Sequence, residues 1–274
     1  MPLLNASSRQ EPEGNIGART LRAPALCFLP SYRTCSENQG GFVWTLALVA
    51  LLGTVLIGRA EVAAAQTGPA AESGVFLIRS GGRNIGSERF QIRQTASGWE
   101  ATGELQLEVP GGQRVTETCS LRVDANWKPT VYQREQQTPK KGSLTADFRP
   151  EGTLLTAKAG AETQEQIFLL PDRNLVVLDT NFFHHYGLLL RQYDTGRPGP
   201  QNFNVFVPQE ATPSTISLVL LGKETLGTDG APLELNHFQA STEDIKIEIW
   251  ATDRREIRRI EIPQATIEIV RQTR

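Results

Sequence analysis

Cysteine is scarce in this chain, and its placement excludes a disulfide framework. The sequence has three cysteines: Cys27 and Cys35 lie in the N-terminal segment, and Cys119 is alone in the body. No two of them have the CxxC spacing that is typical of metal and redox sites. Cys119 alternates in phase with Leu121 and Val123, so we expect a buried structural thiol.

An excess of charge of one sign is also lacking. The 28 basic and 30 acidic side chains leave a formal charge of −2. Proteins that bind nucleic acid usually carry a clearly basic domain, so we exclude nucleic acid as a partner.

The motifs of common enzyme classes are missing. The stretch "SGGRNIG" is not a GxGxxG loop, and there is no G-x-S-x-G elbow. Paired carboxylates such as Glu248 and Glu268 would suit a glycosidase, but glutamates on the polar face of a strand more commonly face solvent. We therefore expect no cofactor and assign no catalytic residue.

One long hydrophobic run decides the compartment. Residues 42–58 form an apolar segment without charge, between a polar leader (residues 1–41) and a small-residue linker (residues 59–73). A spanning helix needs about 17 to 25 residues and a signal-peptide core about 7 to 15, so length does not separate them. Ala63 and Ala65 provide an A-x-A cleavage pattern, so the run is either a cleaved signal sequence or a retained transmembrane helix.

Both alternatives place the body outside the cytoplasm. The leader carries several arginines, and the positive-inside tendency keeps such a segment in the cytoplasm. The protein is therefore expected in the periplasm or cell envelope. An uncleaved run would also anchor it in the inner membrane through residues 42–58.

The remaining residues, 74–274, have the period of β-strands. Segments such as "ELQLEV", "CSLRVDA", "IKIEIW" and "TIEIV" alternate apolar with polar residues and are separated by turns. Gly81 and Gly82 can take the positive φ of a tight hairpin. We predict one antiparallel, all-β domain of about ten to twelve strands.

One stretch, "DTNFFHHYGLLLRQYD" at 179–194, has a helical period instead. Apolar residues recur at steps of three and four, and Asp179 or Thr180 could cap the start. Gly196 and Pro198 follow as helix breakers. A strongly curved sheet or half-barrel wrapped around this one short helix would cover the apolar face of the strands.

Several segments resemble a known family. The hairpin "VFLIRSGGRNIGSERFQI", the short helix after "NLVVLD", the "IEIW" strand and the final "EIRRIEIPQATIEIVR" hairpin look like a widespread family of exported bacterial domains of unknown function. The fold of that family is similar to the half-barrel of the Lol-system lipoprotein carriers. The resemblance covers residues 74–272 and implies a curved antiparallel sheet closed by helices, without any assigned catalytic residue.

His184 and His185 are the most distinctive polar residues of the helical stretch. Neighbouring helical residues point about 100° apart, so we expect that the two imidazoles do not share a metal ion, and we assign no metal site. His237 is expected in a strand at the edge of the core. The residues that a ligand in the sheet would contact are the apolar stripe and one imidazole: Phe182, Phe183, His185, Tyr186, Leu189, Leu190 and Tyr193.

Three functions remain open at this point. The favoured hypothesis is a non-enzymatic envelope protein that holds a lipid-like apolar or amphipathic ligand between the sheet and the helix. The alternative is a structural or interaction module with a solid core, which recruits a protein partner by β-addition. An uncharacterised hydrolase is the third.

Overall fold

The structure is a computed structural model that describes residues 70–109, 111–227 and 232–272. The leader (1–41) and the apolar run (42–58) lie outside the described residues, as does the part of the linker before residue 70. No helix in the described ranges has the length and apolar character needed to cross a membrane.

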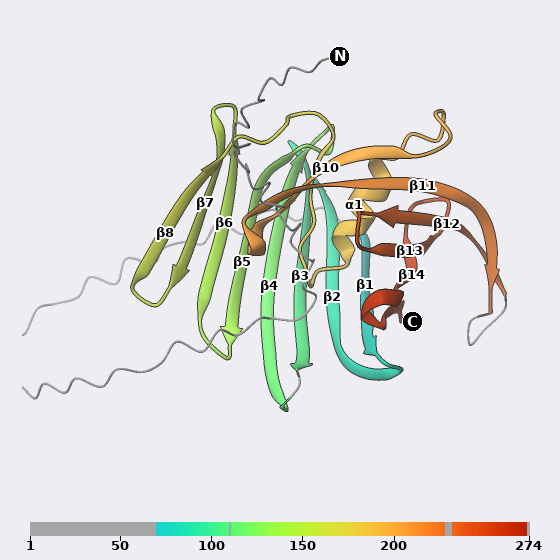
Figure 1. The fold of residues 1–274 in the computed structure, drawn as a ribbon, viewed down its shortest axis with the longest axis horizontal. Helices are drawn as coiled ribbons and strands as arrows, with labels where there is room; N and C mark the ends of the chain where they lie inside the picture. Colours follow the sequence, from blue (N-terminus) through green and yellow to red (C-terminus); the bar gives the residue numbers. More distant parts are fainter. Residues whose placement is uncertain (1–69, 110, 228–231, 273–274) are drawn as a thin grey trace, which may run out of the picture.

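Strands dominate the described chain, as predicted (Figure 1). The first half contains β1 (Ala70–Ser80), β2 (Arg83–Thr95), β3 (Gly98–Val109), β4 (Gln113–Asp124), β5 (Pro129–Thr138), β6 (Gly142–Arg149), β7 (Gly152–Ala159) and β8 (Glu162–Phe168). The second half contains β9 (Leu175–Val177), α1 (His184–Gln192), β10 (Gln201–Val207), β11 (Thr212–Leu226), β12 (Leu233–Ser241), β13 (Lys246–Ala251), β14 (Ile257–Ile262) and β15 (Ile267–Arg271), with 3-10 turns at Pro208–Glu210 and Pro263–Ala265.

All these strands belong to one sheet with the order β8-β7-β6-β5-β4-β3-β2-β1-β15-β14-β13-β12-β11-β10-β9. Neighbours are antiparallel except β9 and β10, which are parallel. The first and last described strands join the two halves of the sheet, because β1 pairs with β15 from Phe76 opposite Arg271 to Ser80 opposite Ile267. The β1–β2 turn has φ of 55° at Gly81 and 78° at Gly82, which confirms the predicted hairpin.

The described residues form 15 strands, so the expected ten to twelve was too few. The sequences of two of these strands, β8 and β9, do not alternate between apolar and polar residues. β8 is an edge strand with both faces exposed and a largely polar sequence, whereas β9 is short and buried on both faces. A strand whose two faces have the same environment has no period-two signal in its sequence.

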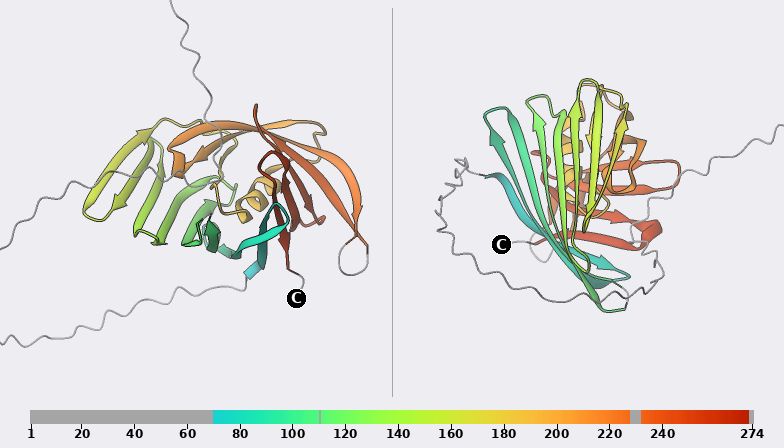
Figure 2. Two further views of the ribbon diagram at one scale, coloured as in Figure 1. Left: turned by 60° about the horizontal axis from the view of Figure 1, so that its bottom comes forward. Right: turned by 90° about the vertical axis from the view of Figure 1, so that its left-hand side faces the viewer.

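The sheet curves around α1, which lies on its concave side (Figure 2). The β9–β10 end folds over the opposite part of the sheet, where Phe206 contacts Phe148 of β6 and Phe168 of β8 at ring distances of 6.2 and 5.0 Å. Phe182, Leu189 and Leu190 are 0% exposed. The concave side of the sheet is therefore the core, and α1 with its preceding residues fills it.

The helix begins later than the sequence predicted. α1 starts at His184, so Phe182 and Phe183 precede it and neither Asp179 nor Thr180 caps it. Asp179 instead accepts hydrogen bonds from the Tyr132 hydroxyl and from the Asn181 N–H. The predicted end agrees better, because the last helical residue is Gln192 and Tyr193 is already extended.

The start of the described chain is tied to both α1 and the last strand. β1 begins at Ala70, before the expected domain start at residue 74. Glu72 is 7% exposed and accepts from Arg191 of α1 at 2.5 Å and from Arg271 of β15 at 2.7 Å. This bridged carboxylate joins three segments that are far apart in the sequence.

Candidate functional site

A carboxyl group from β2 binds the first turn of α1. Glu88 is 0% exposed, and its Oε2 accepts the Phe183 N–H at 2.8 Å, while Oε1 accepts the His184 N–H at 3.5 Å. Oε1 also makes a very short contact with Nδ1 of His184. The first N–H groups of a helix have no partner within the helix, and a local capping residue usually supplies one. Here a residue from a distant strand replaces that cap.

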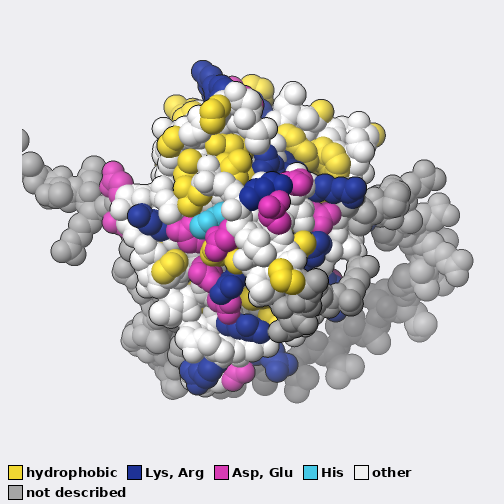
Figure 3. Space-filling model, turned by 90° about the vertical axis from the view of Figure 1, so that its right-hand side faces the viewer, with side chains coloured by type: hydrophobic (Ala, Val, Ile, Leu, Met, Phe, Trp, Pro, Cys, Tyr) yellow, Lys and Arg dark blue, Asp and Glu magenta, His cyan; other side chains and the backbone are white. Residues whose placement is uncertain are grey.

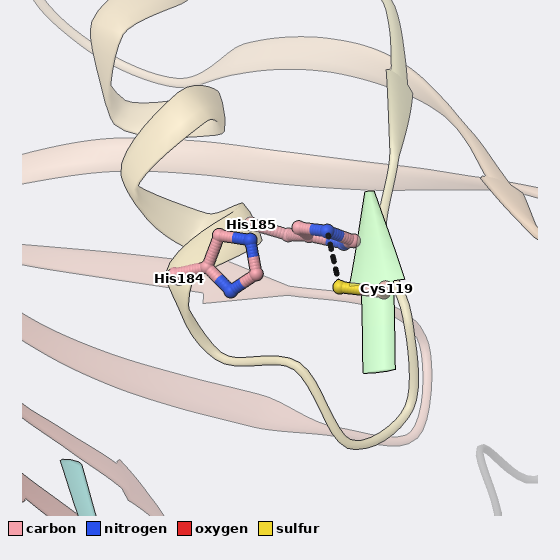
Figure 4. A group of neighbouring side chains, drawn as sticks. All are labelled: Cys119, His184 and His185. Atoms are coloured by element: carbon pink, nitrogen blue, oxygen red, sulfur yellow. Dashed lines mark hydrogen bonds between the residues drawn. The ribbon is translucent and has the colours of Figure 1, made fainter. Parts of the chain in front are cut away.

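The second histidine reaches β4. Nδ1 of His185 accepts the Asp179 N–H at 3.3 Å, and its Nε2 lies 3.9 Å from Sγ of Cys119 (Figure 4). An Nδ1 that accepts a hydrogen bond leaves the proton of the neutral ring on Nε2. His185 therefore directs an N–H toward the sulfur.

His184, His185 and Cys119 form one group. The two imidazole centroids are 4.5 Å apart, and one ligand atom from each of the three residues lies within 4.8 Å of the others. The expectation that the histidines diverge fails here, because Glu88 holds the ring of His184 at the very start of the helix. Nε2 of His184 is buried and has no hydrogen-bond partner among the described residues.

Three further side chains extend this group across β4 and β5. Arg134 donates to both carboxylate oxygens of Glu117, at 3.0 and 2.5 Å. The hydroxyl of Tyr132 donates to Asp179. We call the set the buried polar cluster, and its members are Glu88, Glu117, Cys119, Tyr132, Arg134, Asp179, His184 and His185. It connects β2, β4 and β5 to the segment that leads into α1.

Burial sets the protonation of the cluster. Loss of solvation raises the pKa of Glu88 to about 8, although the two N–H groups it accepts from lower it, and burial reduces the pKa of His184 to about 3. The pair is thus uncharged at neutral pH. Burial also raises the pKa of Cys119 well above its usual value, so the thiol keeps its proton.

This arrangement opposes nucleophilic catalysis. A catalytic cysteine needs a lowered pKa and access to substrate. Cys119 is only 6% exposed and His185 is 0% exposed. The histidines and carboxylates that a hydrolase would need do gather, but inside the core and not in a cleft.

The close approach of β3 to the helix start requires a glycine. A Cβ on Gly103 would lie 2.7 Å from Cδ1 of Phe182 and 2.9 Å from Cε1 of His184. We expect Gly103→Ala to lower the free energy of unfolding by about 1 to 3 kcal/mol, because the packed rings have little room to move. Denaturant unfolding of Gly227→Ala is the control, since nothing lies within 4 Å of a Cβ there and its cost should stay below about 0.5 kcal/mol. Equal losses in the two variants would contradict the close approach.

The seven predicted ligand contacts all lie in the core. Their exposed fractions run from 0% to 5% for Phe182, Phe183, His185, Tyr186, Leu189, Leu190 and Tyr193. Tyr186 lines a cavity of about 30 Å³ together with Val205, Ile216 and Ile247. That volume holds roughly one or two waters. An open hollow of about 600 Å³ shares Val207, Ser214, Thr215 and Thr242 with this cavity and is otherwise mostly polar.

Four members of the buried polar cluster were not predicted from the sequence, namely Glu88, Glu117, Tyr132 and Arg134, but the strand pattern carries a signal for two of them. Glu88 lies in phase with Phe90 and Ile92, which are buried, and Glu117 lies in phase with Cys119 and Leu121. A carboxylate on the apolar face of a strand must be paired or neutralised. That rule would have indicated both positions, although not their partners.

His237 is a strand residue at the edge of the core, as predicted. It lies in β12, stacks on Trp250 at 4.6 Å and contacts Glu224 and Glu248 at 3.0 and 2.9 Å. Acidic and basic side chains are mixed on the face that Figure 3 draws. Arg259 lies over the ring of Trp250, on which His237 stacks, and is 2.8 Å from Glu268. This face is ion-paired and has no single sign of charge.

Comparison with known proteins gives fold neighbours of low similarity. No family model matches the chain, and no curated protein matches it. A protein of the domain of unknown function DUF1849 from Brucella abortus, described as beta-barrel-like, is 10% identical with a TM-score of 0.48; the match covers 73% of this chain and 94% of that one. A DUF1089 family protein from Pseudomonas aeruginosa is 12% identical with a TM-score of 0.43, covering 65% and 90%. Neither name concerns the Lol carriers, and that resemblance stays a prediction.

Proposed function

We propose that this protein is a non-enzymatic interaction module of the cell envelope, which binds an extended segment of a protein partner along β8. The observation that carries the proposal is the free edge of the sheet. β8 pairs with β7, and no other described strand pairs with it. An exposed edge presents a row of backbone N–H and C=O groups that a further strand can bind.

Apolar side chains accompany this edge. Ile167 is 68% exposed, and Leu169, just after the strand, is 86% exposed. Glu162 and Glu165 of β8 are also exposed. Cross-strand pairs favour opposite charges and apolar contacts, so the partner segment is expected to be basic with an apolar residue opposite Ile167.

The packing of the core supports the same function. The residues that would contact a ligand inside the sheet are at most 5% exposed, and the cavity beside Tyr186 is about 30 Å³. Ligand sites for small molecules are typically about 300 to 1,000 Å³. With the core filled, the β8 edge and the outer faces of the sheet are the surfaces left to bind a partner.

The test is a photo-crosslinking residue at Gln164 in β8, in cells that export the protein. We expect one dominant crosslinked partner, and we expect Ile167→Lys with Leu169→Lys to remove it by adding charge where apolar contact is needed. The matched control is Leu221→Lys with Leu233→Lys, because those side chains are 53% and 39% exposed elsewhere. A crosslink that survives the β8 substitutions, or is lost equally in the control, would refute partner binding at this edge.

The earlier lipid-binding hypothesis remains the second candidate. It is supported by the open hollow of about 600 Å³ next to the Tyr186 cavity, where a polar head could lie outside and an apolar group inside. Native mass spectrometry of protein from the envelope fraction separates the two proposals. Copurified lipid without a β8 crosslink would favour the carrier, and equal masses before and after delipidation would count against it.

A further inference from the structure

We propose that Cys119, His184 and His185 bind a divalent transition-metal ion, with Zn²⁺ as the best match. This inference is independent of the proposed partner binding. The three residues come from β4 and from the start of α1, and one ligand atom of each lies within 4.8 Å of the others. Ligand atoms around a tetrahedral zinc are about 3.5 Å apart, given bonds of about 2.0 to 2.3 Å. The pair formed by Cys119 and His185 is already at 3.9 Å, so only a modest contraction is needed.

The second observation is the unpartnered nitrogen. Nε2 of His184 is fully buried and has no hydrogen-bond partner in the described part of the chain, while its Nδ1 contacts the Glu88 carboxyl. Histidines that bind metals usually donate their other ring N–H to a carboxylate, which fixes the ring and its tautomer. Glu88 already occupies the position of that carboxyl group, because its Oε1 contacts Nδ1 of His184 and leaves Nε2 as the free ring nitrogen.

The donor set selects the class of metal. A thiolate with two imidazoles suits Zn²⁺ or copper, whereas Mg²⁺ and Ca²⁺ prefer oxygen ligands.

Binding of a divalent ion by these residues would release two protons. On binding, Cys119 loses its thiol proton, and the Glu88–His184 pair loses one proton, because the carboxyl proton moves to Nδ1 while Nε2 releases its own. His185 keeps its proton but moves it from Nε2 to Nδ1, which gives up the 3.3 Å bond from the Asp179 N–H. Two protons leave as one divalent ion enters, so the net charge of the cluster does not change.

The experiment is metal reconstitution of the full chain. Cys27 and Cys35 are replaced by Ser in the parent protein, so that Cys119 is the only thiol. Because the site is buried, metal is expected to enter during folding, and the parent is unfolded with chelator and refolded with Co²⁺. We expect about one Co²⁺ per chain after gel filtration, with a thiolate-to-cobalt charge-transfer band.

Variants assign the signal to residues. Cys119→Ser in the same parent should lose the charge-transfer band, and His237→Gln should keep it, because that histidine lies outside the cluster. A parent without the band, or a band that persists in Cys119→Ser, would overturn the proposal.

X-ray absorption of the zinc-loaded parent gives an answer that does not depend on how the variants fold. One sulfur at about 2.3 Å and imidazole nitrogens at about 2.0 Å are expected. A shell of oxygen and nitrogen without sulfur would place the zinc elsewhere and reject the site.

Discussion

Replacing Glu88 by Ala is expected to lower the free energy of unfolding by about 3 kcal/mol or more, because several buried groups lose their partner at once. The N–H groups of Phe183 and His184 and the Nδ1 of His184 all contact this carboxyl. A buried polar group without a partner costs about 1 to 3 kcal/mol, and the removed side chain also leaves a cavity. Equilibrium denaturant unfolding followed by tryptophan fluorescence measures the loss.

Glu88→Gln is the matched variant. Its amide oxygen can accept from the Phe183 N–H, and its amide nitrogen can donate to His184, so the loss should stay near 1 kcal/mol or less. Hydrogen exchange should show faster exchange of the Phe183 and His184 amides in Glu88→Ala alone. If the Ala and Gln variants lose the same stability, the carboxyl does not act as the cap of α1.

Replacing Arg134 by Met is expected to lower the free energy of unfolding by about 3 to 5 kcal/mol. Glu117 is 2% exposed and receives two hydrogen bonds from this guanidinium. Removal of one partner of a buried ion pair leaves an uncompensated charge, whereas removal of both is often nearly neutral. The double variant Arg134→Met with Glu117→Gln should therefore recover most of the stability in denaturant unfolding.

An exposed pair provides the control for this effect. Lys128 lies 2.9 Å from Asp172, and their side chains are 45% and 81% exposed. Lys128→Met should change the free energy of unfolding by less than about 1 kcal/mol, because solvent screens the pair. A comparable loss in the Arg134 and Lys128 variants would mean that burial does not set the strength of the first pair.

The strand at Cys119 and the helix after His184 show which structural features the sequence could predict. The alternation around Cys119, Leu121 and Val123 predicted a strand with a buried thiol, and β4 has that structure. The three- and four-residue steps from Tyr186 to Leu190 predicted the helix, which is local information. The true start of α1 at His184 was not predictable, because its cap, Glu88, comes from a strand far away in the sequence.

The same distinction applies to the histidines. Their type and adjacency are visible in the sequence, but the positions of the two rings depend on contacts with β2 and β4. Glu88 contacts His184 and Cys119 contacts His185, and the sequence around residue 184 does not indicate either partner. Sequence spacing alone therefore suggested divergence where the folded chain brings the ligand atoms together.

By itself, the sequence determined an all-β domain with antiparallel strands and one short amphipathic helix, because these follow from residue periods within single segments. Only the tertiary structure decided that the 15 described strands join through β1 and β15, that no described strand pairs with the outer edge of β8, and that eight polar side chains meet near the start of α1. The physical reason is that pairing, closure and burial of charge depend on contacts between distant segments, and these form only when the curved sheet closes around the helix.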